Sequence, residues 1–385
     1  MSSVDGVPGD GCARLPPEII SQILEELSDF TADMCNCSLV CRTWLPFARH
    51  NLHIVIRMHK EPRYSEIIKS PANTFTSTIR TLTLLFDVDL PSYRHIFPPL
   101  ANYQSLRSLY LCRCSLPDDC PVLPRITELY LWGTKFSSRV SFARFMSGLS
   151  AVRVLEIVNN SWLTVGVDQG SFPVFDLDSL TIDCVHLLLT ADDLRSFYTP
   201  KLILDLCSSA EATAESLRSV SQFLHHLNTH LKYLNLDCDA RIGQTCALDF
   251  RRNKNIEWLR ISNALRLNVC LEVFEVSIHP DLERVLTNIL PHCLLQEIIL
   301  VVETDNLSNP PVWPSIGRLA ELLDLAQFAT VRTIQFIVDG SPFCLKGSAR
   351  LARECFEPLV RAAIPSHPNR KIIYVDGEDP DEIWC

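Results

Sequence analysis

The residues whose types and spacing come closest to supporting chemistry are three histidines in this 385-residue chain, His225, His226 and His230. His226 and His230 are four residues apart, so a helix would place both imidazoles on one face, as a shared metal ion requires. No Asp, Glu or Cys lies close by in the sequence to complete such a site. We therefore interpret the cluster as a solvated helix surface and predict no metal site.

Cysteine is the second residue type that could do chemistry, because the chain contains 16 of them. Cys35-x-Cys37 and Cys112-x-Cys114 come nearest to a metal-binding pair, but neither has a second pair at zinc-finger spacing. Many of the others lie in apolar strings, such as Cys184 in "LTIDCVHLLL". We interpret the cysteines as reduced thiols that act as small hydrophobic side chains.

Motifs for nucleotide, phosphate or hydrolase chemistry do not occur in the sequence. Only 12 glycines are present, and none forms a GxxxxGK[ST] loop, an ordered GxGxxG or a GxSxG elbow. The acidic residues at the end of the sequence form a run of the kind that is usually solvated. We predict no catalytic residue and no cofactor. An enzyme whose site residues are dispersed along the chain stays open as an alternative.

Composition narrows the class of protein and of partner. Hydrophobic residues make up 47% of the chain and charged residues 21%, as in a globular protein with a sizeable core. The formal net charge is −10 and no basic stripe occurs, so nucleic acid is not an expected partner. The sequence has no secretion signal and no apolar run near the ~18 residues of a membrane span. We expect no membrane partner, no disulfides and an intracellular location, cytoplasmic or nuclear.

The segment from Leu15 to His50 predicts three short helices. Two prolines at its start suit a first helical turn, and apolar residues recur at helical spacing as far as Leu27. Further helices are expected over 34–40 and 42–50. A segment of about 36 residues is too short to bury a stable core by itself. Either it packs on the remaining chain, or another protein completes it.

Several separate short motifs occur along this segment. Leu15-Pro16 opens it, Ile23-Leu24 follows on the first predicted helix, and "SLVCRTW" (38–44) closes it. The pattern resembles the F-box, a short helical module that docks onto the Skp-type adaptor of cullin–RING ubiquitin ligases. The resemblance implies that the adaptor is bound by the apolar residues of the motif: Leu15, Pro16, Ile19, Ile23, Leu24, Leu27, Leu39, Val40, Cys41 and Trp44. An N-terminal three-helix cap on a larger domain is the alternative.

Beyond Lys60 the sequence repeats a leucine-rich pattern. "LRSLYLCRCSL" (106–116) fits L-x-x-L-x-L-x-x-[NC]-x-L, with Cys114 in the Asn/Cys position, and it resembles the leucine-rich repeat. Further copies, some of them weaker, start at positions 79, 126, 152, 177, 201, 231, 256, 295 and 331. The earlier copies follow the known period of ~20–29 residues, whereas later ones are irregularly spaced.

These copies predict how the larger part of the chain folds. The leucines of the x-L-x-L-x core point to one side of a strand, and helical stretches such as 214–230 lie between the strands. One strand and one helix cannot bury their apolar faces alone, whereas stacked copies form a continuous core. We therefore predict an α/β fold, in which a three-helix F-box precedes an irregular leucine-rich-repeat solenoid with parallel strands on the concave face and helices on the convex face. A helix over 351–364 and a strand over 371–376 are expected to close the stack.

The residues that flank the central leucines are expected to face the concave side of the sheet. Tyr110, Tyr130 and Trp132 fall on adjacent predicted strands, which lie ~4.8 Å apart, and such aromatic residues are frequent at binding hot spots. We predict that this face binds a target protein through Tyr110, Glu128, Tyr130, Trp132, Glu156, Tyr233 and Trp258. Coverage of the face by a loop or by the acidic tail is the alternative.

The predicted domain order is a disordered N-terminus (1–12), an F-box (13–57), a linker (58–77), a solenoid (78–345), a cap (346–376) and an acidic tail (377–385). The resemblance implies a substrate-recognition subunit of an SCF-type cullin–RING ubiquitin ligase. Its partners would be the Skp-type adaptor, the cullin scaffold reached through that adaptor, and an unidentified protein substrate. Two alternatives stay open: an F-box scaffold without ubiquitin transfer, and a leucine-rich-repeat binding module with a helical cap.

Overall fold

The computed structural model describes residues 15–27, 33, 36–37, 44–45, 47–48, 53–57, 76–86, 100, 103–116, 118, 122–162, 172–183, 189–205, 214–237, 248, 250, 252–270, 273–278, 282, 286, 294–305, 315–324, 328–339, 348–364 and 370–376. The chain divides into two compact units, Met1–Tyr110 and Leu111–Cys385. The division falls inside strand β3 (Ser108–Cys112), and each unit is described by itself.

The first unit contains helix α1 (Pro17–Glu26), which begins as the two prolines of the sequence predict. The N–H groups of Ile19 and Ile20 both donate to the Pro16 carbonyl, so the first turn forms without a side-chain cap. Ile20 and Leu24 are buried against Ala48, and the partly buried side chains packed around them are Leu27, Cys37, Trp44 and Phe47. This cluster is the small core of the N-terminal segment.

The first unit also contains two parallel strands, β1 (His53–Arg57) and β2 (Thr81–Leu85), and the start of β3. Buried and partly buried residues alternate along β2, where Leu82 and Leu84 are fully buried. The predicted second and third helices lie largely outside the described residues. Within the third, the Ala48 N–H donates to the Trp44 carbonyl at 2.9 Å, which is the spacing of an α-helical turn.

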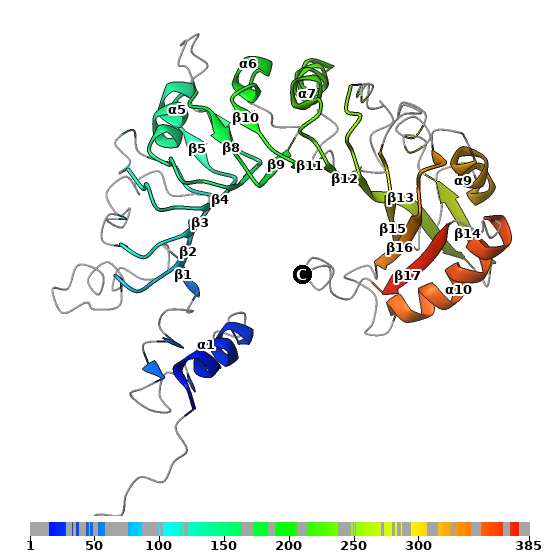
Figure 1. Ribbon diagram of the computed structural model, residues 1–385, viewed down its shortest axis with the longest axis horizontal. Coiled ribbons are helices and arrows are strands. Elements are labelled where there is room, and N and C mark those ends of the chain that lie inside the picture. The colour runs from blue at the N-terminus through cyan, green and yellow to red at the C-terminus, as the bar shows by residue number, and fades with distance from the viewer. Residues whose placement is uncertain are drawn as a thin grey trace, which may run out of the picture. The chain divides into compact units, whose positions relative to one another are not determined.

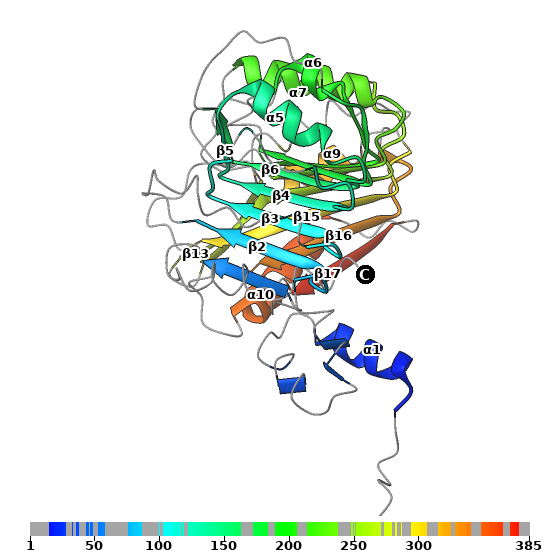
Figure 2. The same ribbon diagram turned by 90° about the vertical axis from the view of Figure 1, so that its left-hand side faces the viewer.

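The second unit is built on one long sheet, whose strands follow each other in chain order (Figures 1 and 2). Its described strands are β4 (Glu128–Trp132), β6 (Val154–Val158), β9 (Ser179–Asp183), β11 (Lys201–Asp205), β12 (Tyr233–Asp237), β13 (Trp258–Cys270), β15 (Glu297–Asp305), β16 (Thr333–Asp339) and β17 (Lys371–Asp376). Neighbours in this series pair in parallel, and β14 (Val273–Ile278) runs antiparallel to β13. The prediction of parallel strands in the leucine-rich copies is confirmed.

Helices connect many of these strands. Among the described residues of this unit they are α5 (Arg139–Ser147), α6 (Ala191–Leu194), α7 (Ala214–Leu227), α9 (Ile316–Leu323) and α10 (Ser348–Ala363). Figures 1 and 2 show α5, α6 and α7 on the same side of the sheet. Helix α10 contacts β16 and β17, so the predicted helix and strand at the end of the series are confirmed as elements. The short pairs β5 (Lys135–Phe136) with β7 (Ser161–Trp162), and β8 (Phe175–Asp176) with β10 (Phe197–Tyr198), lie outside the main sheet.

Successive strands of the sheet begin with the same backbone hydrogen-bond pattern. Thr127 directly precedes Glu128, the residue of β4 that is in register with the first residue of β6. The Thr127 carbonyl accepts the N–H groups of both Arg153 and Val154. Pro200, Lys232, Glu257 and Gln296 accept in the same way from the strand that follows each of them. Because this contact fixes where each strand begins, the leucines of successive strands stay in line and are buried together. Leu129, Leu155, Leu180, Leu202, Leu234 and Leu259 all have relative exposures of 0–1%.

Three successive strands also end in the same way. Arg113, Gly133 and Asn159 each follow a strand and each have a left-handed backbone, with φ values of 56°, 64° and 54°. Only glycine adopts this conformation without steric cost, so two of the three positions tolerate some strain to make the turn. The repeated turn sends the chain away from the end of the strand at equivalent points of each copy.

A ladder of buried polar side chains joins these turns. The Thr134 hydroxyl donates to the Leu111 carbonyl at 2.9 Å and accepts from the Cys114 thiol at 3.8 Å. The Asn160 side chain donates to the Leu131 carbonyl at 2.9 Å and accepts the Thr134 backbone N–H at 2.7 Å. Cys114, Thr134 and Asn160 occupy the Asn/Cys position of three consecutive copies, so this position satisfies backbone groups that the turns would otherwise leave unpaired.

The described part of the chain is therefore a mixed α/β structure with a large parallel sheet and six helices. No helix within the described ranges is long and apolar enough to cross a membrane.

Candidate functional site

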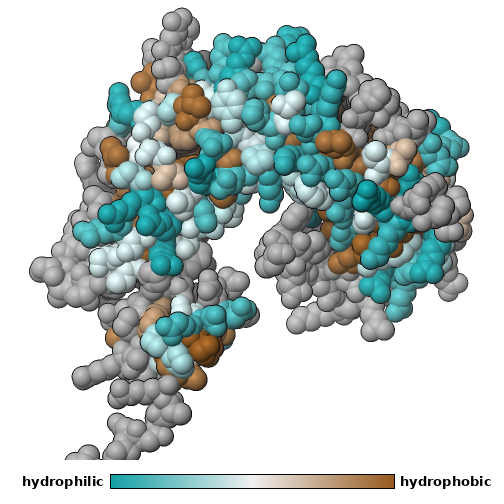
Figure 3. Space-filling view, viewed as in Figure 1, coloured by the Kyte–Doolittle hydropathy of each residue, from teal (hydrophilic) through white to brown (hydrophobic). Residues whose placement is uncertain are grey.

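Helix α1 and the residues that lead into it present a second apolar row, adjacent to the row that packs into the small core. Leu15 is 44% exposed, Ile19 41% and Ile23 36%, and they recur every four residues along one side of the helix. We call these three residues the α1 stripe. The brown hydrophobic surface of this segment is visible in Figure 3. An apolar row on a short segment is costly to leave in water unless another surface covers it.

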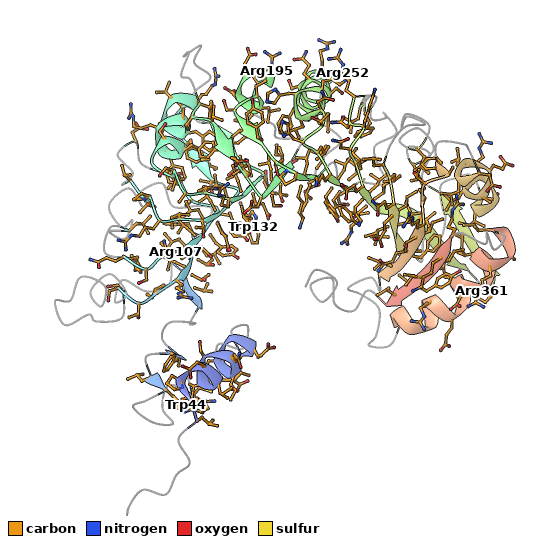
Figure 4. All side chains as sticks on the ribbon, viewed as in Figure 1. Trp44, Arg107, Trp132, Arg195, Arg252 and Arg361 are labelled. Carbon is orange, nitrogen blue, oxygen red and sulfur yellow. The ribbon has the colours of Figure 1, made fainter. Side chains whose placement is uncertain are left out.

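The structure divides the predicted adaptor-binding residues into two sets. Pro16 is exposed beside the α1 stripe, whereas Leu24 is fully buried and Leu27 and Trp44 pack into the small core. Figure 4 labels Trp44 within this segment. Leu39, Val40 and Cys41 lie outside the described residues. The buried set holds α1 in place, and the exposed set is what a partner can touch.

The comparisons with known proteins bear on this segment. A family model described as F-box-like matches residues 12–58. This segment is an F-box-like domain. No curated protein matches the chain. The match starts just before the α1 stripe and extends past β1, so the stripe and the small core both belong to the F-box-like domain.

In the second unit, the side chains between the core leucines form what we call the flank face of the sheet. Its positions on β4, β6, β9, β11, β12 and β13, in order, are Glu128, Tyr130 and Trp132; Val154, Glu156 and Val158; Ser179, Thr181 and Asp183; Lys201, Ile203 and Asp205; Tyr233, Asn235 and Asp237; and Trp258, Arg260 and Ser262. The predicted residues Glu128, Tyr130, Trp132, Glu156, Tyr233 and Trp258 all lie on it.

Trp132 on β4 contacts both Tyr130 on the same strand and Glu156 on β6. The rings of Tyr130 and Trp132 are 6.4 Å apart at 75°, an edge-to-face arrangement. The Trp132 Nε1–H donates to Glu156 Oε1 at 2.5 Å, although Trp132 remains 41% exposed. Figure 4 labels Trp132. Burial raises the pKa of the Glu156 carboxyl and the nearby charge of Asp205 raises it further, while the bond from Trp132 lowers it. Trp132 thus holds a carboxylate at a surface that solvent reaches.

A second cluster occupies the flank face of β11, β12 and β13. The Lys201 ammonium lies 5.4 Å from the centre of the Tyr233 ring, and Tyr233 is directly opposite Trp258 in register. Burial lowers the pKa of Lys201, and the charge of Arg260 lowers it further. Burial also raises the pKa of the Tyr233 hydroxyl, although the charge of Arg260 opposes that rise. This part of the face carries the cations Lys201 and Arg260 together with the carboxylates of Asp205 and Asp237.

The solvent exposure of the flank face differs along the sheet. Trp132 and Trp258 are 41% and 36% exposed, so the face is accessible at β4 and at β13. Ile299, Val301 and Ile337, at flank positions of β15 and β16, are only 3–5% exposed and form a separate buried cluster with Val375. The open part of the face therefore ends before β15.

Two expectations for this face and its neighbours need correction. Flank position does not mean solvent exposure at β3, where Ser108 is 8% and Cys112 6% exposed. Tyr110 is partly buried and belongs to the first unit, and its grouping with Tyr130 and Trp132 stays a prediction. The histidines of α7 are not a fully solvated row, because the rings of His226 and His230 lie 4.9 and 5.7 Å from the ring of Tyr198.

Residues that the sequence did not single out become visible through strand pairing. Asp183, Asp205 and Asp237 are aligned in register on three neighbouring strands, and Lys201 lies over Tyr233. The repeated aspartates directly after a core leucine or isoleucine were a possible signal in the sequence. No group of three His, Cys, Asp or Glu side chains suited to a metal ion is found among the residues that the structure describes.

Proposed function

We propose that this chain is the substrate-recognition subunit of a cullin–RING ubiquitin ligase, with a Skp-type adaptor bound to residues 12–58 and a target protein bound to the sheet of the second unit. The observation that carries the proposal is an F-box-like domain whose first helix exposes the α1 stripe. F-box domains typically bind Skp-type adaptors, and the chain itself would perform no bond chemistry. A cullin scaffold would be reached through the adaptor.

The energetics of the α1 stripe support adaptor binding. Burying a whole Leu or Ile side chain is worth about 2 kcal/mol, and about 40% of each stripe residue is still exposed in the isolated chain. Covering the three residues would thus contribute about 2.4 kcal/mol, or about 50-fold in affinity. Leu24, Leu27 and Trp44 contribute indirectly, by holding α1, while we propose that Leu39, Val40 and Cys41 complete the interface.

Adaptor capture by stripe variants tests this half of the proposal. The triple variant Leu15→Ala, Ile19→Ala, Ile23→Ala should bind a purified Skp-type adaptor about 50-fold more weakly by isothermal titration calorimetry. The matched control replaces three exposed polar residues at the same spacing on α1, with Glu18→Ala, Gln22→Ala and Glu26→Ala. The control should retain its affinity within about threefold, because those side chains add little apolar area. Equal affinities for the two triple variants would contradict the proposed interface.

We propose that the second unit is an irregular leucine-rich-repeat solenoid. The shared strand entry, the left-handed residues Arg113, Gly133 and Asn159, and the buried ladder support equivalent stacked copies. Stacked repeats commonly present an extended binding face. Here that face would be the flank face.

Target binding on the flank face has its own test. Tyr130→Ala with Trp132→Ala should leave adaptor affinity unchanged and should deplete the other proteins that co-purify with the chain. If the chain is an F-box scaffold, those proteins should still co-purify with it but should not be ubiquitylated. If the chain is a leucine-rich-repeat module with a helical cap, it should fail to bind the adaptor. Adaptor titration and ubiquitylation of the co-purified proteins separate these alternatives from the ligase subunit.

A further inference from the structure

We propose that Glu156 and Glu297 are positioning residues of the face that binds the target protein. Glu156 holds the exposed indole of Trp132 in the orientation that the target meets, and Glu297 does the same for Trp258. This inference rests on the proposed function, because it describes how the flank face contacts its target. A grouping of tyrosine, tryptophan and glutamate that occurs twice on the flank face carries the inference.

The first of these groups lies on β4 and β6. The Trp132 Nε1–H donates to Glu156 Oε1, and the ring of Tyr130 is edge-to-face with the indole. Glu156 is directly opposite Tyr130 in register, so the carboxylate that holds the indole comes from the next strand of the sheet. We call Tyr130, Trp132 and Glu156 the β4 group.

The second group lies on β12, β13 and β15. Trp258 donates a side-chain hydrogen bond to the Glu297 carboxylate, which is directly opposite it in register on β15. On its other side, Trp258 is opposite Tyr233. Burial raises the pKa of Tyr233, the charge of Arg260 opposes that rise, and the charge of Glu297 adds to it, so Glu297 also lies near this tyrosine. We call Tyr233, Trp258 and Glu297 the β13 group.

The hydrogen bond fixes each indole without covering its ring. An indole has one polar atom, the Nε1–H donor, so a bond at that atom restricts both side-chain torsions and leaves the faces of the ring available. Trp132 and Trp258 are indeed 41% and 36% exposed, although both donate to a carboxylate. Burial raises the pKa of both acceptor carboxyls and the bond from tryptophan lowers it, so the bond favours the ionised acceptor, which binds an N–H more strongly than a neutral one.

An indole that is ordered before binding contributes more to affinity than a mobile one. Tryptophan and tyrosine are frequent at binding hot spots, and a side chain that is already fixed does not have to be ordered by the target. Loss of this ordering should weaken target binding by about two- to twelvefold for each indole, which corresponds to the ~0.5–1.5 kcal/mol that ordering one side chain costs. Glu156 and Glu297 thus act on the target through the tryptophans.

The positions of the two groups describe the target that they fit. From β4 to β13 there are five strand steps, which at ~4.8 Å each span about 24 Å. The flank positions between the two groups carry charges of both signs, Lys201 with Asp205 on β11 and Asp237 on β12. The target class is therefore a protein surface with two apolar contact points about 24 Å apart, and not one selected by its net charge.

Solvent exchange of the indole N–H groups tests the positioning without a target. The full chain contains six tryptophans, which are labelled with 15N at the indole and followed by NMR. Glu156→Ala should speed exchange of the Trp132 Nε1–H at least tenfold and leave that of Trp258 unchanged, and Glu297→Ala should do the reverse. Glutamine at either position keeps an acceptor oxygen and should retain most of the protection. The matched control is Thr181→Ala, in register with Glu156 on β9, which should change neither rate.

A double-mutant cycle tests the effect on the target. The probe is the purified protein that Tyr130→Ala with Trp132→Ala depletes most from the co-purifying set, and its affinity is measured by isothermal titration calorimetry. Glu156→Ala should weaken it by about two- to twelvefold in the wild-type chain and by nothing further in the Trp132→Ala chain, because the glutamate acts through the indole. Glu156→Gln should stay within twofold of the wild type.

Three results would overturn the inference: unchanged exchange of the Trp132 Nε1–H in Glu156→Ala, an additive loss in the cycle, or equal losses of affinity for Glu156→Gln and Glu156→Ala. The last result would mean that the target contacts the carboxylate charge itself. The proposed function fails in a different way. If Tyr130→Ala with Trp132→Ala depletes no co-purifying protein, the target face is wrong; if it depletes one whose affinity Glu156→Ala does not change, the face stands and the positioning role does not.

Discussion

Asn160→Ala tests whether the buried polar ladder holds the repeated turns in place. Asn160 is 6% exposed, and its side chain satisfies the Leu131 carbonyl and the Thr134 N–H. Alanine removes both hydrogen bonds and leaves two backbone groups in a site closed to solvent. Each unsatisfied buried group costs about 1–3 kcal/mol, so we expect the free energy of unfolding to fall by about 3 kcal/mol.

Urea denaturation followed by far-UV circular dichroism measures this loss of unfolding free energy. The comparison requires that the slope of the unfolding free energy against urea concentration is the same in the variant and the wild type. Asn159→Gly is the matched control, because Asn159 is an exposed neighbour of the same residue type with φ 54°, a conformation that glycine accepts. Its stability should change by no more than about 0.5 kcal/mol. A loss below about 0.5 kcal/mol for Asn160→Ala, or equal losses in both variants, would refute the role of the ladder.

The other predictions concern the small core, the ladder hydroxyl and the Glu156 carboxyl. Leu24→Ala should destabilise the F-box-like domain by about 2–5 kcal/mol and speed its limited proteolysis, whereas the α1 stripe variant should be cut at the wild-type rate. Thr134→Val should cost about 1–2 kcal/mol in urea denaturation, because the Leu111 carbonyl loses its donor. Since the folded state raises the pKa of Glu156, it holds that proton more tightly than the unfolded chain, so this residue's contribution to stability should fall as pH rises above about 4.5. Glu156→Gln should abolish that part of the pH dependence, and identical pH profiles for the two proteins would contradict the assigned cause.

The core of the sheet could be predicted from the sequence because its leucines alternate within each copy. Each x-L-x-L-x unit corresponds to a parallel strand, and the leucines, such as Leu129 and Leu131, are fully buried. The buried residues of α1 and the residues of the α1 stripe were all predicted as apolar positions of this segment. Helical spacing alone could not say which of them face inward. That choice depends on Ala48, Trp44 and Phe47, which approach α1 only in the folded segment.

The flank face was harder to predict, since alternation shows which way a side chain points but not what covers it. Cys112 and Val301 occupy equivalent flank positions by this rule, yet both are buried. The alignment of Asp183, Asp205 and Asp237 depends on the pairing of strands that are separated by irregular connections, so no local pattern reveals it. The packing of His226 on Tyr198 likewise joins two copies and cannot be read within one.

The most direct test that the chain joins an adaptor to a target is affinity purification of two variants, with the adaptor and the remaining co-purifying proteins quantified by mass spectrometry. We expect opposite losses. The α1 stripe variant should lose the Skp-type adaptor and keep the proteins bound to the sheet, while Tyr130→Ala with Trp132→Ala should keep the adaptor and lose those proteins. Retention of the adaptor by the stripe variant, or the same losses in both variants, would contradict a chain that joins an adaptor to a target through two separate surfaces.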